Sequence, residues 1–279
     1  MTTTLRPTGP IQRDDTGATA RTYDVCVNGR PVGAVELATD PGAGRPVGQV
    51  RSLRIDDADR RRGRGTVAAL AAEEVLRGWN CTEVRASIPA DAAAALRMAA
   101  ALGYTERGRN MLKEPLGPSP ALPDGVESRP MGEQEFDRWR SHAVRQFAQD
   151  WISRGVPEAE ALARSEAVHV RLLPDGRATP GTHIHNLLDE GTAVGHVWVS
   201  ETEVRPGQEG AYVFDVEVAP DRRGQGYGRA LMLLAERIAA GAGQRRIALH
   251  VFEGNTPALA LYESLGYRTT HRNFVKRLL

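Results

Sequence analysis

The chain has 279 residues, a length that suits one large domain or two of modest size. Hydrophobic residues make up 41% of it and charged residues 25%, the composition of a globular protein with a core of its own. The 36 Lys and Arg nearly balance the 35 Asp and Glu, giving a net charge of +1. The overall charge therefore gives no reason to expect nucleic acid or a membrane as a partner.

The N-terminal residues, Met1 to Arg13, contain no apolar segment of the kind found in a secretory signal. No run in the chain reaches the ~18 apolar residues of a membrane-spanning helix. Cys26 and Cys81 lie in strand-like stretches and lack the spacing of metal ligands, so we interpret them as reduced core thiols. The sequence predicts a cytoplasmic protein with a flexible tail over residues 1–20.

The first half of the chain, residues 21–114, opens with a predicted hairpin in which an Asn28-Gly29 turn joins two strand-like runs. A further strand-like run, residues 50–55, precedes a loop rich in Arg and Gly, Arg61 to Val67. This loop is followed by apolar residues at the spacing of an amphipathic helix: Leu70, Ala71 and Val75.

Residues 115–125 are rich in Pro and Gly and carry no hydrophobic periodicity, so they predict a semi-rigid linker. The second half, residues 126–279, begins with two predicted helices at about 133–154 and 157–172, for which the first half has no room. A strand-like run over residues 212–218 then leads into a second loop rich in Arg and Gly and another amphipathic helix.

Several sequence matches between the two halves occur in the same order. Gly65 of the first loop matches Gly226 of the second, and Leu102-Gly103-Tyr104 recurs as Leu265-Gly266-Tyr267 at nearly the same offset along the chain. Ordered matches at a nearly constant offset indicate duplication of a whole domain. Strands with interspersed helices in each half predict two tandem domains of the α/β (α+β) class.

The second loop has the chemistry of a site for a diphosphate. A strand–loop–helix turn leaves backbone N–H groups unpaired at the helix start, where glycines admit a ligand and the helix dipole favours an anion. Arg222, Arg223 and Arg229 add positive charge. The loop lacks the Lys of a Walker loop, and Arg229 stands where a dinucleotide fingerprint needs its third glycine. The remaining pattern is the Arg-x-x-Gly-x-Gly loop for coenzyme A, met by Arg223, Gly226 and Gly228.

Together with the later motif from Asn255 to Tyr267 (Asn-x6-Tyr-x3-Gly-Tyr), this loop makes residues 126–279 resemble the GCN5-related N-acetyltransferase (GNAT) family. The resemblance implies two GNAT-like domains in tandem, each a mixed, mostly antiparallel sheet flanked by helices, with the N-terminal domain truncated and degenerate. It also implies acetyl-CoA, or another acyl-CoA, as co-substrate. The plainer interpretation of the loop is a helix cap whose glycines are structural.

Carried onto this sequence residue by residue, the resemblance assigns coenzyme A contacts to the strand before the loop, to the loop and to the second motif. A backbone N–H at Val218 would polarise the thioester carbonyl, and Asn255 would contact the pantetheine arm. The alternative for Asn255 is a turn residue, with Thr256 as the expected N-cap. The assigned residues are Val216, Val218, Arg223, Gly224, Gln225, Gly226, Tyr227, Gly228, Arg229, Asn255, Ala258 and Tyr262.

The predicted catalytic residues are Tyr262, His250 and Glu217. In GNAT enzymes that resemble this chain, the Tyr at the matching position protonates the departing thiolate, and a phenol (pKa ~10) can serve a thiol that titrates near ~8.5. His250 stands where ribosomal-protein-alanine acetyltransferases carry a glutamate base, and imidazole titrates near neutral pH. Glu217 and Asp215 are the other candidate bases, because Tyr212 occupies the position of the usual strand carboxylate. A packed aromatic or a buried strand histidine is the alternative for Tyr262 and His250.

The first half lacks most of these groups. With Gly65 aligned to Gly226, Val67 stands in place of Gly228 and crowds the loop. A register shifted by two, Arg60-x-x-Gly63-x-Gly65, keeps the loop pattern. Ala99 stands at the position of Tyr262, and Ala92 stands at that of Asn255. We therefore expect the first half to have a structural or substrate-shaping role.

The sequence thus predicts an enzyme that transfers an acyl group from acyl-CoA, most fittingly acetyl-CoA, to a primary amine of a small molecule or peptide by direct attack on the thioester. The competing hypothesis is a non-catalytic GNAT-fold module that binds acyl-CoA or a small molecule. His183 and His185 alternate on one stretch without a third ligand at suitable spacing, so we expect no metal. A monomer or a homodimer is expected, and the acceptor amine stays open.

Overall fold

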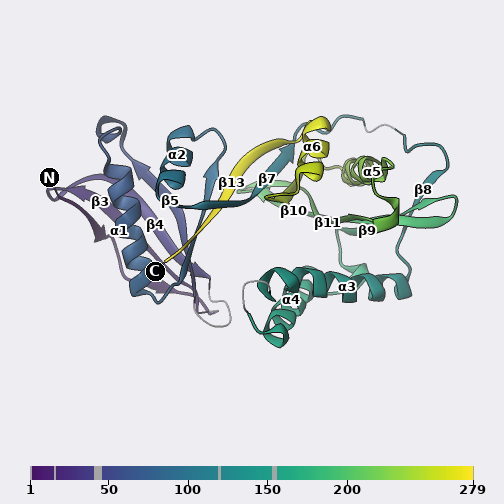
Figure 1. Ribbon diagram of the computed structural model, residues 1–279, viewed down its shortest axis with the longest axis horizontal. Coiled ribbons are helices and arrows are strands. Elements are labelled where there is room, and N and C mark those ends of the chain that lie inside the picture. The colour runs from purple at the N-terminus through teal and green to yellow at the C-terminus, as the bar shows by residue number, and fades with distance from the viewer. Residues whose placement is uncertain (1, 16, 41–45, 119–120, 153–155, 279) are drawn as a thin grey trace. The chain divides into compact units, whose positions relative to one another are not determined.

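The computed structural model describes residues 2–15, 17–40, 46–118, 121–152 and 156–278 (Figure 1). The chain forms two compact units. Unit 1 comprises Met1–Arg109 and Thr269–Leu279, and unit 2 comprises Asn110–Arg268. The C-terminal strand therefore packs with the N-terminal half, although the sequence boundaries place it in the second domain. Within the described residues, no helix is both long and apolar enough to cross a membrane.

Unit 1 is built on a mostly antiparallel sheet, in which β5 and β6 run parallel and the other neighbours antiparallel. A short strand, β2 (Gln12–Arg13), pairs with β3. The strands follow the order β1 (Thr3–Pro7), β3 (Thr19–Val27), β4 (Arg30–Asp40), β5 (Val47–Ile55), β6 (Glu83–Pro89) and β13 (Arg268–Arg277).

The segment that we expected to be a flexible tail contains a strand instead. β1 pairs with β3 from Thr3 opposite Val27 to Pro7 opposite Tyr23, and Leu5 packs against the core of unit 1. A strand with a single large apolar residue gives almost no hydrophobic pattern in the sequence, which is why it was missed. Residues 1 and 16 of the expected tail lie outside the described residues.

One face of this sheet is covered by helix α1 (Arg64–Gly78), as Figure 1 shows. Ala68, Ala72 and Leu76 recur at every fourth position of α1 and are fully buried, so the helix presents one apolar stripe to the strands. Alternate residues of β3 and β4 meet this stripe and are fully buried as well, among them Val25 and Val35. A second helix, α2 (Ala93–Ala101), lies between β6 and β7 in the chain.

Unit 2 carries a second sheet, in which β11 and β12 run parallel and the pairs β8–β9, β9–β10 and β10–β11 run antiparallel. The end of β7 (Thr105–Lys113), from Asn110 onward, belongs to this unit and lies next to β12. The other strands follow the order β12 (Ile247–Phe252), β11 (Gln208–Val218), β10 (Thr192–Arg205), β9 (Thr182–Asp189) and β8 (Val126–Pro130).

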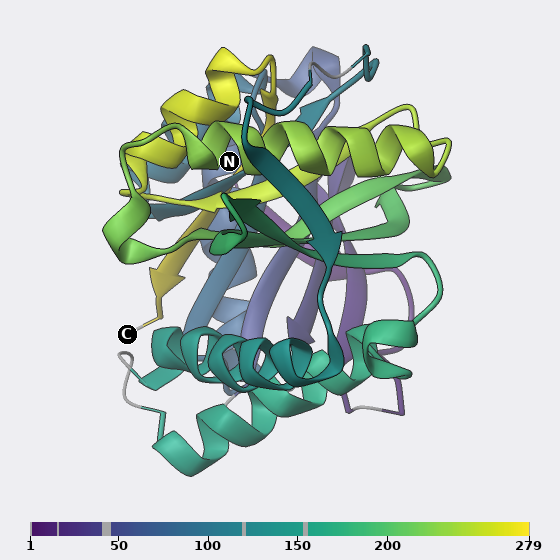
Figure 2. The same ribbon diagram turned by 90° about the vertical axis from the view of Figure 1, so that its right-hand side faces the viewer.

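Helices cover both faces of this sheet. Figure 2 shows α5 (Tyr227–Gly241) along one face, and α3 (Glu133–Ile152) with α4 (Glu158–Leu172) along the other. The α5 face holds an aliphatic core that also receives α6 (Thr256–Ser264) through Tyr262, whereas the α3 face holds an aromatic cluster around Trp139 and Trp198. α3 and α4 correspond to the two helices expected before the second sheet. The predicted end of the first, residues 153–154, lies outside the described residues.

The two units repeat each other at one constant offset through their loops and later elements. α1 starts at Arg64 and α5 at Tyr227, α2 at Ala93 and α6 at Thr256. The helix N-caps, Gly63 and Gly226, both have left-handed backbones, with φ of 72° and 90°. The alignment of Gly65 with Gly226 is therefore wrong. The shifted register is the correct one, and unit 1 keeps the backbone pattern Arg60-x-x-Gly63-x-Gly65.

A bulge interrupts the equivalent strand of each unit. In unit 2, Val199 pairs with Val213 and Trp198 with Asp215, so Phe214 is the extra residue. The register of β11 with β12 runs only from Ala211 to Val213, and the two strands separate beyond the bulge. In unit 1, β5 and β6 pair from Val47 to Val50, and the extra residue is Arg51. The same local geometry thus opens both sheets at one end.

Each unit completes its core with the last strand of the other half of the sequence. In unit 1, Lys276 of β13 lies 2.7 Å from the buried carboxylate of Glu73 on α1. In unit 2, Lys113 of β7 lies 2.7 Å from the buried carboxylate of Glu236 on α5. The two lysines and the two glutamates are separated along the chain by the same offset as the helix starts. The duplicated domains have exchanged their final strands and kept the ion pair that each strand supplies.

Candidate active site

The opening beyond the bulge of β11 is the first part of a candidate site in unit 2. Residues 214–218 pair with β10 on one side, while the register with β12 has already ended at Val213. Because backbone N–H and C=O groups point alternately to the two sides of a strand, part of this segment faces the opening. An extended ligand can pair with these groups as a strand would. The predicted contacts Val216 and Val218 lie on this segment.

The loop before α5 ends in backbone geometry suited to an anion. Gly224 and Gly226 have φ of 77° and 90°, a region that glycine tolerates and other residues avoid. A Cβ built on either glycine would meet no atom within 4 Å, so open space lies beside both. Gly228 is more enclosed, with Leu261 3.4 Å from the position of a Cβ. A diphosphate could therefore approach the loop and the unpaired N–H groups of α5.

The side chains around this loop have different roles. Arg223 is largely exposed, and its Nε donates to the carbonyl of Val218 at 3.4 Å. Gln225 turns back to the carbonyl of Asp221 at 3.4 Å. Two of the predicted contacts are engaged within the protein: Tyr227 donates to the carboxylate of Asp189, and Arg229 donates to Ser264 at 2.6 Å. Arg223 is thus the side chain best placed to meet a phosphate.

Asn255 lies at the start of α6, after the end of β12. Its Oδ1 accepts a hydrogen bond from the backbone N–H of Ala258 at 3.2 Å, which makes Asn255 the N-cap of the helix. Thr256, the N-cap expected from the sequence, is the first helical residue. One side chain therefore has both the capping role and the predicted ligand contact, and a carboxamide can serve both because its NH₂ group remains a donor.

Tyr262 lies in the middle of α6 and is 7% exposed. Burial, followed by the negative charge of Asp215, raises the pKa of Tyr262 to about 12. The phenol is therefore protonated throughout the physiological pH range and can donate its proton.

His250 belongs to β12 and faces the end of β7. Its Nδ1 lies 2.9 Å from Oδ1 of Asn110, a distance that suits an Nδ1–H donor to the amide oxygen. Burial lowers the pKa of His250, so the imidazole is neutral near pH 7. Its Nε2 is then the nitrogen with a lone pair. A neutral imidazole is chemically able to accept a proton, and the bond to Asn110 links His250 to β7.

Glu217 lies on β11 between the guanidinium of Arg223 and the imidazole of His142. Its Oε1 is 3.8 Å from Nη2 of Arg223, and its Oε2 is 3.3 Å from Nε2 of His142 on α3. The carboxylate thus connects the loop of α5 with the helix on the other side of the strand. Its position on the segment beyond the bulge agrees with the sequence prediction, whereas the partner on α3 could not be seen from spacing along the chain.

Sequence reasoning missed the partners of Asp215. Its Oδ2 accepts two hydrogen bonds, one from Nε1 of Trp139 on α3 and one from Nε2 of His196 on β10, each 2.9 Å long. Burial acts to raise the pKa of Asp215, but these bonds and the charges of His196 and His142 outweigh it, so the pKa is lowered. The contacts depend on the β10–β11 register and on the bulge, which the sequence does not reveal.

Unit 1 keeps the backbone of this site but not its side chains. Ser52 and Arg54 stand at the positions of Asp215 and Glu217, and Ala99 stands at that of Tyr262. In its loop, the charge of Asp59 is taken up by Arg64, the first residue of α1, and by Arg30. Unit 1 therefore has the loop geometry without counterparts of Tyr262, Asp215 and Glu217.

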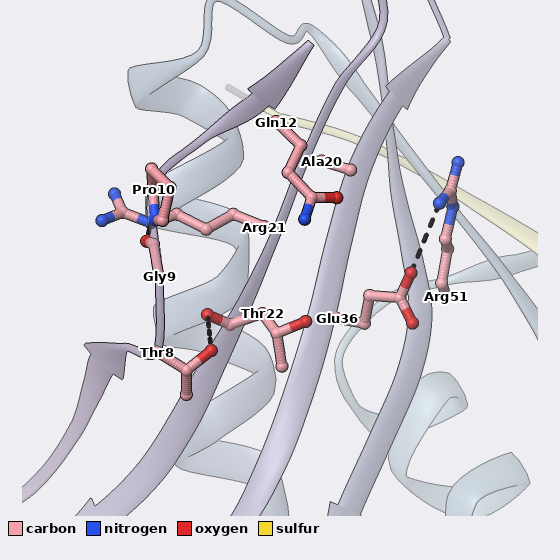
Figure 3. A pocket seen from close by; sticks show the side chains of 9 residues that line it. All are labelled: Thr8, Gly9, Pro10, Gln12, Ala20, Arg21, Thr22, Glu36 and Arg51. Carbon is pink, nitrogen blue, oxygen red and sulfur yellow. Dashed lines mark hydrogen bonds and ion pairs between the residues drawn. The ribbon is translucent and has the colours of Figure 1, made fainter. Parts of the chain in front are cut away.

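A polar hollow of about 130 Å³ lies on unit 1 between the N-terminal segment and β3 to β5 (Figure 3). Arg21 donates to the carbonyl of Gly9 at 2.8 Å across it, and Arg51 pairs with Glu36 at 3.3 Å. It shares no residue with the site in unit 2. His183 and His185 lie on β9, and no group of three potential metal ligands occurs among the residues that the structure describes.

Comparisons with known proteins agree with this geometry. A family model described as Acetyltransferase (GNAT) family matches residues 4–104 and 137–267. The uncharacterized N-acetyltransferase YycN of Bacillus subtilis is 32% identical over 152 residues, 53% of this chain and 96% of that protein. Mycothiol acetyltransferase of Amycolatopsis mediterranei is 34% identical over 265 residues, 90% of this chain and 81% of that enzyme. A GCN5-related N-acetyltransferase from Sphaerobacter thermophilus has a similar fold, with a TM-score of 0.60 at 20% identity, covering 92% of this chain and 80% of that one.

Proposed function

Because the chain belongs to the acetyltransferase (GNAT) family and is an N-acetyltransferase, we propose that unit 2 transfers an acetyl group from acetyl-CoA to a primary amine of a small molecule or peptide. The observation that carries this proposal is the combination of the open glycine loop of α5 with the separated strands β11 and β12 and the buried phenol of Tyr262. These features lie in one unit of the fold. They would hold the diphosphate, the pantetheine arm and the leaving thiol respectively.

The proposed donor fits the residues present. Open space beside Gly224 and Gly226 leaves room for the diphosphate, and Arg223 supplies a positive charge. Val216 and Val218 lie on β11, and Asn255 and Ala258 lie at the start of α6, the helix that carries Tyr262. We propose that these four residues contact the pantetheine arm. The thioester supplies an activated acyl group, which an amine can attack directly. The protein is proposed to act as a monomer or a homodimer in the cytoplasm, without a metal.

The reaction converts an ammonium ion and a thioester into an amide, a thiol and one proton. The amine nitrogen forms the new C–N bond while the C–S bond breaks, and Tyr262 donates its proton to the departing sulfur. The ammonium nitrogen loses two protons, one before attack, which frees its lone pair, and one as the amide forms. One of them replaces the proton that Tyr262 gives to sulfur, and the other passes to solvent. We propose His250 and Glu217 as the candidates that accept a proton from the nitrogen. His250 has the neutral imidazole for this task, whereas Glu217 has the position beside the opening.

Two measurements test this function. Isothermal titration of the full chain with acetyl-CoA and CoA should show binding, and thiol release should depend on an added amine. The amine panel should include the acceptor of mycothiol acetyltransferases, because several relatives carry that name. Binding without amine-dependent thiol release would favour the non-catalytic alternative. Absence of binding would contradict the proposed coenzyme A site.

A further inference from the structure

The α3 side of the site in unit 2 contains a carboxylate that the proposed proton transfers do not use. Asp215 directly follows the bulged Phe214 and points toward α3, since it contacts Trp139 there. Its side chain is 33% exposed, so part of the carboxylate remains accessible. Both of its hydrogen bonds end on Oδ2. Among the described residues, Oδ1 accepts none.

The position of this carboxylate follows from the bulge. In a regular strand, the neighbouring residues Phe214 and Asp215 would point to opposite faces of the sheet, so only one of them could face α3. The bulge instead lets Phe214 stack on Trp198, with ring centroids 4.7 Å apart, while Asp215 meets Trp139 on the same side of the sheet. It places Asp215 at the residue where β11 leaves β12.

The charges around Asp215 show what kind of ligand suits it. β11 adds the carboxylate of Glu217, two residues further on, while β10 supplies His196 and α3 supplies His142 near Glu217. Nη2 of Arg223, from the loop, lies 3.8 Å from Oε1 of Glu217. Asp215 therefore has one accessible oxygen without an opposing Lys or Arg among the described residues, which is an arrangement that favours a cation.

From this geometry we infer that Asp215 binds the ammonium group of the acceptor, and that Trp139 and His196 are positioning residues that aim its free oxygen. The inference rests on the proposed function, because it places the acceptor on the α3 side of the strands that would hold the thioester. It also limits the acceptor to amines that are protonated when they bind. Neutral amine isosteres, such as an alcohol of the same shape, are then poor ligands.

The same contact explains why α3 matters to the site. The indole N–H of Trp139 is the direct link between this helix and the carboxylate. The described part of unit 1 has no counterpart of α3, and it has Ser52 at the position of Asp215 and Arg54 at that of Glu217. Ser52 is uncharged and Arg54 forms an ion pair with Asp56 at 2.8 Å, so unit 1 lacks the carboxylate on which the ammonium site of unit 2 depends.

A matched pair of variants tests the inference in the full chain. Trp139 and Trp198 are buried in the same aromatic cluster, 5% and 3% exposed, and each indole donates a hydrogen bond of 2.9 Å. The Trp198 bond goes to Ser200 instead of Asp215. Trp139→Phe and Trp198→Phe therefore each replace a buried indole by a smaller ring and each remove one hydrogen bond of the same length. Because hydrogen bonds to charged groups are stronger than neutral ones, we expect about tenfold or more loss in kcat/KM for the amine with Trp139→Phe only.

The loss should appear in the KM for the amine, with the KM for acetyl-CoA within about twofold of wild type in both variants. Asp215→Asn should lose at least as much as Trp139→Phe, because an amide cannot hold an ammonium ion by charge. His196→Gln keeps an N–H donor at the same reach and should retain most of the activity, whereas His196→Leu should not. Equal losses in Trp139→Phe and Trp198→Phe, or a change confined to acetyl-CoA, would overturn the inference.

A second measurement does not require an acceptor to be known. The indole N–H signals of Trp139 and Trp198, assigned through the two Phe variants, are followed by NMR while methylammonium chloride is added to the CoA-bound protein, with sodium chloride as control. We expect the Trp139 signal to shift and the Trp198 signal to stay, and Asp215→Asn to abolish the shift. No shift in a protein that binds CoA would refute the ammonium site while leaving the proposed transferase intact. Failure to bind CoA would instead refute the proposed function.

Discussion

At the scale of single residues, the side chains of the candidate site in unit 2 differ in their surroundings. Tyr262 is buried and keeps its proton, Asp215 keeps its charge, and Asn255 caps the helix that carries Tyr262. Each of these properties follows from the surroundings of the side chain and not from its type. Tyr212 is a second partly buried tyrosine in unit 2 whose pKa is also raised by burial, but it lies on β11 and contacts Phe214.

Removing the phenol hydroxyl of Tyr262 tests its role as the acid. Tyr262→Phe keeps the ring that packs in the core of unit 2, so we expect a folded protein that still binds acetyl-CoA. Loss of general acid catalysis should lower kcat by about 10²–10⁴-fold. Tyr212→Phe is the matched control and should change kcat less than threefold. A steady-state thiol-release assay checks both, and similar rates for the two variants would remove Tyr262 from the mechanism.

The pH dependence provides a second test of Tyr262. A pKa raised to about 12 means that the phenol stays protonated well above its ordinary titration range. Ionisation of the acid should therefore cause no decline of kcat between pH 8 and about pH 10. The measurement is the pH profile of kcat at saturating amine, corrected for spontaneous thioester hydrolysis. A decline centred near pH 9 or 10 that Tyr262→Phe abolishes would show that the phenol titrates normally.

The motifs of the candidate site could be recognised in the sequence because they are local. The loop from Arg223 to Gly228 and the motif from Asn255 to Tyr267 each depend on residues that are adjacent in the chain. The partners of Asp215 were not accessible in this way. Trp139 is 76 residues from Asp215 and His196 is 19 residues from it, and both contacts depend on a bulge that shifts the strand register by one residue.

At the scale of elements, the exchanged last strands are the most consequential feature. β13 belongs to unit 1 and the end of β7 to unit 2. Each carries a lysine that meets a nearly fully buried glutamate, Glu73 or Glu236. Burial, and next the charge of that glutamate, raises the pKa of the neighbouring tyrosine in both units. A buried carboxylate of this kind depends on its lysine for compensation.

Lys276→Met should therefore destabilise unit 1, since it leaves Glu73 buried without its cation. Breaking a buried pair at one side costs about 3–5 kcal/mol, and we expect the low end because the lysine is partly exposed. The double variant Lys276→Met, Glu73→Leu should recover most of the loss, because it removes the unpaired charge. Urea unfolding monitored by hydrogen exchange in α1 measures both. A single variant as stable as wild type would show that the pair contributes nothing.

The repeat itself could be predicted from the sequence, but its register could not be settled. Two glycines spaced by one residue occur in both loops, and the sequence offers two ways to align them. The left-handed N-caps Gly63 and Gly226 decide between them, since only one glycine of each loop starts the helix. The strand exchange could not be predicted from the sequence either, because the hydrophobic pattern of a strand does not depend on which of the two sheets it joins.

At the scale of the whole molecule, one duplicated backbone carries two different sets of side chains. Both units have the bulge, the separated strands and the glycine loop. Unit 2 has the acid, the carboxylates and the covering helices, whereas unit 1 has alanines, a serine and an arginine at the equivalent positions. Because unit 1 keeps the backbone without these side chains, we propose that it serves the fold and that unit 2 alone performs the transfer.

The most direct test compares the two N-cap glycines. Gly226→Ala and Gly63→Ala each place a Cβ on a left-handed residue beside open space, so both should destabilise the protein similarly, by about 1–3 kcal/mol. The decisive measurement is the dissociation constant for acetyl-CoA, together with the rate of amine-dependent thiol release, below the melting range of both variants. We predict that Gly226→Ala weakens binding and turnover at least tenfold and that Gly63→Ala leaves both within twofold of wild type. Equal losses in the two variants, or a loss with Gly63→Ala alone, would contradict a single working site in unit 2.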